Sequence, residues 1–149
     1  MSSVPAVRAA LVTLLTATLP DTQVIYGPLS AVTTTKARVA TVGKVTNANR
    51  DLNTMGIDTT EEQYTIELAF SVDLPGAGTL ATAVSQVFAD YTVAEVAIRE
   101  FAGGPQLGLA ASGVLRVLMT GDWESDEQAD IEGAHAAVRC SVAVIAQNT

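Results

Sequence analysis

The sequence predicts an α+β domain in which a mostly antiparallel sheet has two helices packed on one face. Residues 64–73 (YTIELAFSVD) and 134–144 (AHAAVRCSVAV) alternate between apolar and small or polar residues, which is the period of a strand with one buried face. Residues 4–18 instead repeat apolar side chains at the three-to-four spacing of a helix. A chain of 149 residues is long enough for one core, so we expect a single domain over residues 1–149.

The first element is predicted to be a helix of the domain rather than a leader peptide. Ser2 or Ser3 can cap this helix, Pro5 suits its first turn, and Pro20 ends it. Its apolar run lacks an A-x-A cleavage site and is too short to span a bilayer, so we expect an intracellular protein without membrane contact.

Two strands and a long loop are predicted to follow. The strands are TQVIYGP and residues 36–45 (KARVATVGKV). Residues 46–60 (TNANRDLNTMGIDTT) show no periodicity, and loops of this length usually have a function or are disordered. This loop is therefore a candidate partner interface, with the candidate residues Asn49, Arg50, Asp51, Asn53 and Met55.

In the second half of the chain, LPGAG ends the strand at 64–73. Gly78 or Thr79 caps a second helix, whose apolar face runs from Leu80 to Tyr91. The segment VAEVAIREF favours a further strand. Residues 114–123 (VLRVLMTGDW) predict another one, with Leu115, Val117 and Met119 on one side.

Residues 121–133 (GDWESDEQADIEG) are the best candidate for a binding site. Asp122, Glu124 and Asp126 copy the first three ligand positions of a calcium loop. However, Glu127 stands where the loop needs glycine, and the bidentate glutamate is missing. We therefore favour a solvated hairpin loop without a metal, next to which Trp123 is either a core residue or an interface anchor.

The second faces of the two alternating strands are unusual. They carry small and semi-polar residues, including Glu67 and Asp73, where a solvated face usually carries more long charged side chains. Contact with another protein and exposure to solvent are equally compatible with this pattern.

No constellation for catalysis or cofactor binding is present. The sole histidine, His135, has no Ser or Cys at a motif-like spacing, and the sole cysteine, Cys140, lies on the apolar side of its strand. The formal net charge of −8 disfavours sequence-independent binding of nucleic acid, although a channel that passes DNA should also avoid binding it.

The order of elements resembles the tail terminator proteins of long-tailed bacteriophages. The resemblance covers the whole chain, and its nearest fragments are PAVRAALVTLLTATLP, VIYGPL and EEQYTIELAFSV. It implies a virion protein without catalytic residues or cofactors, in which six copies form a ring. That ring would cap the tail tube, join it to the head-completion proteins, and let DNA pass without specific binding.

Glu67, Asp73 and the acidic residues from Asp122 to Glu127 would then be candidates for the wall of the channel. Two alternatives remain. A head-closure protein or a tail-tube subunit has a similar α+β pattern, and tube subunits usually expose a long hairpin. A small enzyme or ligand-binding domain is the other class.

Overall fold

The computed structural model describes residues 2–27, 36–53, 59–101, 104 and 106–148. The elements in chain order are α1 (Val4–Thr18), β1 (Gln23–Tyr26), β2 (Arg38–Asn53), β3 (Thr59–Pro75), α2 (Leu80–Arg99), η2 (Ala110–Ser112), β4 (Val114–Ala129) and β5 (Gly133–Asn148). Ser3 and Thr79 stand at the N-cap positions of α1 and α2, as predicted, but neither side chain makes a capping hydrogen bond.

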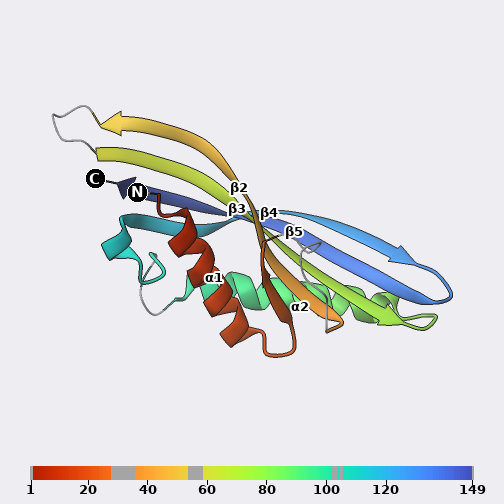
Figure 1. Cartoon of the computed structure of the whole chain (residues 1–149). Coiled ribbons are helices and arrows are strands. Elements are labelled where there is room, and N and C mark those ends of the chain that lie inside the picture. Colours follow the sequence, from red (N-terminus) through yellow and green to blue (C-terminus); the bar gives the residue numbers. More distant parts are fainter. Residues whose placement is uncertain (1, 28–35, 54–58, 102–103, 105, 149) are drawn as a thin grey trace.

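The strands form one sheet of five strands in the order β1-β2-β3-β5-β4. β1 pairs with β2 in parallel, and the other three pairings are antiparallel. Figure 1 shows both helices on the same side of the twisted sheet. The predicted α+β class is therefore confirmed.

The core lies between the helices and the inner faces of β3 and β5. The alternation predicted for these two strands is confirmed, because Tyr64, Phe70, Val138 and Val142 are all buried. α1 contributes Val7, Leu11 and Leu15, and α2 contributes Ala83, Val87, Ala94 and Ile98.

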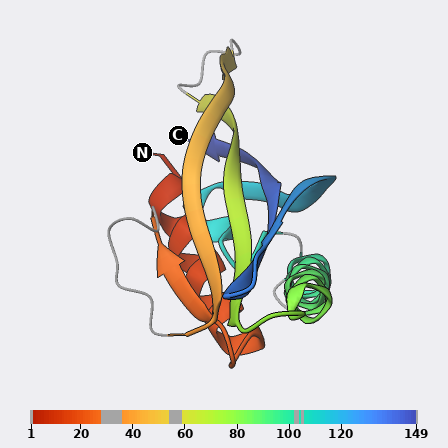
Figure 2. The same cartoon turned by 90° about the vertical axis from the view of Figure 1, so that its right-hand side faces the viewer.

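The prediction of a loop over residues 46–60 is wrong for residues 46–53 and 59–60, and residues 54–58 lie outside the described residues. β2 continues to Asn53 and pairs with β3 from Thr59, so the two strands form a long hairpin with a shift of register between Asn47 and Asn49. Backbone hydrogen bonds hold the two strands together where no apolar alternation marks them. Figure 2 shows this hairpin extending beyond α1.

The prediction of a strand over VAEVAIREF is also wrong. The stretch from Val93 to Arg99 is the second half of α2, and the helix buries Asp90, Tyr91, Ala94 and Ile98 at helical spacing. The buried side of this helix is hard to recognise in the sequence, because the charged residue Asp90 belongs to it.

The region from 114 to 133 differs from the prediction in two ways. The acidic residues do not form a loop, because β4 continues to Ala129 and pairs with β5. A shift of register between Val114 and Arg116 also breaks the predicted alternation. Val114 and Val117 are therefore buried, whereas Leu115 is 49% exposed.

A close backbone contact fixes the start of β5. A Cβ atom at Gly133 would lie 2.5 Å from the carbonyl oxygen of Leu74, and a backbone atom cannot move aside easily. We expect Gly133→Ala to lower the free energy of unfolding by about 1–3 kcal/mol, measured by urea denaturation. Gly43→Ala is the matched control, because its Cβ would meet the Glu67 carbonyl oxygen at an ordinary 3.7 Å. Equal effects of the two substitutions would contradict the close contact.

Candidate functional site

The residues predicted as a partner loop lie on the arm formed by β2 and β3. Asn49, Arg50, Asp51 and Asn53 belong to β2 and pair with Gln63, Glu62, Glu61 and Thr59. Met55 lies outside the described residues. β1 pairs with β2 only from Val39 to Val42, so within the described residues the arm has a strand edge without a neighbour from Gly43 onward. The arm therefore presents a backbone edge, not a loop.

Four of the predicted acidic-site residues come together at one open concavity of about 360 Å³. Glu67, Asp122, Trp123 and Glu124 line it together with Arg139 and Ser141. A register shift between Met119 and Trp123 produces it, with Gly121 at a φ of 83°. The concavity combines carboxylates with an aromatic side chain and a single guanidinium group.

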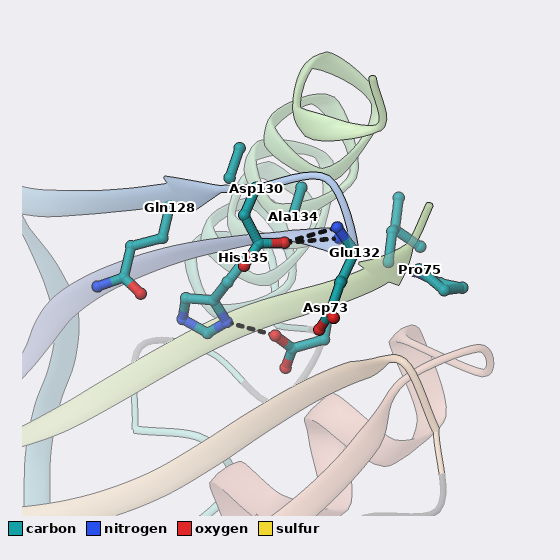
Figure 3. Close-up of a pocket in the computed structure, with 10 residues that line it drawn as sticks. Asp73, Pro75, Gln128, Asp130, Glu132, Ala134 and His135 are labelled. Atoms are coloured by element: carbon teal, nitrogen blue, oxygen red, sulfur yellow. Dashed lines mark hydrogen bonds and ion pairs between the residues drawn. The ribbon is translucent and has the colours of Figure 1, made fainter. Parts of the chain in front are cut away.

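Asp73 lies elsewhere, at a second open concavity of about 630 Å³ near the β4–β5 turn. Its carboxylate is 2.7 Å from the Nδ1 atom of His135. Figure 3 marks this contact with a dashed line. Both side chains are on the outer face of the sheet, where the sequence placed them. The pair joins β3 to β5 across the sheet.

Asp126 and Glu127 do not join either concavity and point to opposite faces of β4. Asp126 is opposite Ala137 on the outer face, and Glu127 is opposite Ala136 on the inner face. This alternation cannot wrap the carboxylates around one ion as a calcium loop does. Among the residues that the structure describes, no group of three or more His, Cys, Asp or Glu side chains is placed to hold a metal.

Trp123 is neither fully buried nor isolated. Its side chain is 51% exposed, and its ring packs edge-to-face against Phe88 of α2 with the centroids 5.2 Å apart. Half-exposed aromatic side chains with a fixed orientation suit protein contacts.

Cys140 lies in the core. Its Sγ atom is 3.7 Å from the Leu68 carbonyl oxygen, and burial raises the pKa of the thiol to about 12. A thiol that is buried and protonated at neutral pH is a poor nucleophile.

Two polar clusters were not predicted from the sequence. In the first, the buried Asp90 carboxylate accepts hydrogen bonds from Arg38 and from the Thr22 hydroxyl, so α2 is tied to β2 and to the residue before β1. The Asp90 carboxylate raises the pKa of Arg38. The sequence signal that could have revealed this cluster is the charged Asp90 among the apolar residues on the buried side of α2.

The second cluster fixes the start of α1. Glu62 of β3 is 5% exposed and accepts hydrogen bonds from the Ser2 hydroxyl at 3.0 Å and from the Ser3 backbone N–H at 3.4 Å. The negative charge of Glu62 stabilises the N-terminus of α1, where the helix dipole is positive. The Ser3 and Tyr64 hydroxyls are 2.8 Å apart.

The environment of Tyr64 predicts a loss of stability in alkali. Burial raises the pKa of its hydroxyl from 10.0 to about 12, so the stabilisation is complete below pH 10 and is lost as the pH rises through 12. We expect the free energy of unfolding to fall by about 2 kcal/mol over this range from this group. Denaturation of Tyr64→Phe at several pH values should give a shallower decline. An equal slope for both proteins would contradict the assignment.

A scan against models of protein families and a search of curated proteins found no match to this chain. Among the described residues, no helix is both long enough and apolar enough to cross a membrane.

Proposed function

We propose that the protein is the subunit of a closed ring that terminates the tail tube of a long-tailed bacteriophage. The ring joins the tail to the head-completion proteins and lets DNA pass. The subunit acts through its surfaces, and no residue has a catalytic role.

The observation that carries the proposal is the outer face of the sheet, which neither helix of the described residues covers. Both helices pack on the inner face, whereas the outer face of β3 and β5 is lined by small, partly exposed residues. These are Thr65, Ala69, Ser71, Ala137, Ser141 and Ala143. Small residues let a neighbouring backbone approach closely and lose little side-chain entropy on contact. This face therefore suits either a subunit contact or the smooth wall of a channel.

The charge of the outer face supports its use as the wall of a channel. Glu67, Asp73, Glu124 and Asp126 belong to this face, together with the cations Arg139 and Arg116. An acidic wall repels the phosphate backbone, so DNA slides without binding.

A tail-tube subunit is the second candidate, and the β2–β3 arm favours it. A long hairpin that extends past the helices can reach a neighbouring ring. The two functions differ in what remains when the protein is missing.

Electron microscopy of particles assembled without the protein separates them. For a terminator we expect tail tubes that form but stay separate from filled heads, because the closing ring is absent. Absence of tubes would instead identify a tube subunit. Joined particles of normal appearance would overturn both proposals.

A further inference from the structure

An apolar groove lies between the second half of α2 and the first half of β4. Its volume is about 290 Å³, and Ile98, Val117, Leu118 and Met119 form its apolar lining. Glu95, Arg99 and Arg116 also line it. Arg99 is paired with Glu95 at 3.4 Å, and within the described residues Arg116 has no ion pair. Because Glu95 already pairs with Arg99, the groove has an apolar floor and offers the guanidinium group of Arg116 at its rim.

The turn between β4 and β5 has the complementary chemistry. Ile131 at this turn is 86% exposed, the largest exposed fraction among the exposed large apolar side chains of the described residues. It stands between Asp130 and Glu132, both exposed. An apolar side chain between two carboxylates matches an apolar groove beside the guanidinium group of Arg116.

The turn is held in one conformation. The Asp130 carboxylate accepts hydrogen bonds from the backbone N–H groups of Glu132 at 2.8 Å and Gly133 at 3.0 Å. The Glu132 carbonyl oxygen accepts a further one from Gly76 at 2.7 Å. A rigid turn loses little entropy when it binds.

The turn and the groove of one chain lie far apart. The bond to Gly76 places the turn beside the start of α2, whereas Arg99 is the last residue of this helix of 20 residues. Such a helix is about 30 Å long. Figure 1 likewise shows the β4–β5 turn at one end of the molecule and the end of α2 toward the other. Ile131 therefore needs a second chain to reach such a groove.

We propose that the β4–β5 turn of one copy docks in the α2–β4 groove of the next copy. Ile131 fills the apolar floor, and Glu132 pairs with Arg116. Two different surfaces meet in this contact, so it is heterologous and can close into a ring. The inference rests on the proposed function for the closure of the ring, whereas the contact itself can be tested without any phage particle.

Charge reversal tests the pairing. Ile131→Ser should weaken the contact about 10-fold to 100-fold, seen by analytical ultracentrifugation as smaller assemblies at equal concentration. Glu132→Arg and Arg116→Glu should each weaken it, and their combination in one chain should restore it. Asp21→Arg is the matched control, because this exposed acid lies between α1 and β1, at the edge of the sheet opposite β4. Wild-type assembly by all three variants at Ile131, Glu132 and Arg116 would overturn the contact.

Mixing and cross-linking separate the contact from the ring. A chain with Ile131→Ser keeps a functional groove, and a chain with Arg116→Glu keeps a functional turn, so their mixture should stop at dimers. Oxidation of a mixture of Ile131→Cys and Met119→Cys chains should give a covalent dimer, since the native Cys140 is buried. A ring that forms without this cross-link refutes the contact and leaves the proposed function standing. If the cross-link forms but the protein has no role in tail joining, the contact stands and the proposed function is refuted. If the wild-type chains do not associate and the cysteine variants do not cross-link, the contact is refuted.

Discussion

Replacing Arg38 by methionine should lower the free energy of unfolding by about 3–5 kcal/mol, because it leaves a buried carboxylate without its cation. The Asp90 side chain is 2% exposed, whereas the Arg38 side chain is 25% exposed. After the substitution, the Thr22 hydroxyl is the remaining partner of Asp90 shown by the structure. The neutral stem of methionine keeps part of the packing, so the loss reports mainly on the charge.

Two further variants make this result specific. Arg99→Met removes an exposed pair within α2 and should cost less than about 0.5 kcal/mol. Asp90→Leu should cost less than Arg38→Met, because the Arg38 side chain that remains can reach water. Urea denaturation of the three proteins gives the order. Similar losses for Arg38→Met and Arg99→Met would show that the buried pair is not a main support of the fold.

Reversing the charge of Glu67 and Asp73 should slow or stall the ejection of DNA if the outer face of the sheet lines the channel. Two added lysines would attract the phosphate backbone to a wall that otherwise repels it. The effect should weaken as salt is added, because screening acts over about 10 Å at 0.1 M ionic strength. Ejection from assembled particles, followed by the release of DNA, measures it.

The structure also supplies controls for this experiment. Glu67→Gln and Asp73→Asn remove the charges without reversing them, and Asp73→Asn can keep a hydrogen bond to His135. These variants should eject DNA nearly as the wild type does. Unchanged ejection from normally assembled particles with lysine at both positions would place the two residues outside the channel.

The elements that the sequence predicted well are those with one face in the core. α1, β3 and β5 show the period of their structure, because Leu11, Phe70 and Val142 each face the core from a regular element. The end of the β2–β3 arm and the acidic half of β4 have no such signal. Residues 120–129 are exposed on both faces, so their side chains carry no alternation and their backbone pairing holds the strand.

The candidate site was predictable only in part for a related reason. The sequence placed Glu67 and Asp73 on the outer face of one strand, and the structure separates them into two concavities. The register of β3 against β5 brings His135 opposite Asp73, and the shift in β4 brings Trp123 to the concavity that Glu67 also lines. Register and bulges depend on long-range pairing, which a local pattern does not contain.

The mass of the assembled protein in solution, alone and mixed with tail-tube protein, tests the closed ring most directly. Analytical ultracentrifugation should show one species with six times the mass of the chain, formed either by the protein alone or on contact with the tube. Strictly monomeric behaviour under both conditions would contradict the ring.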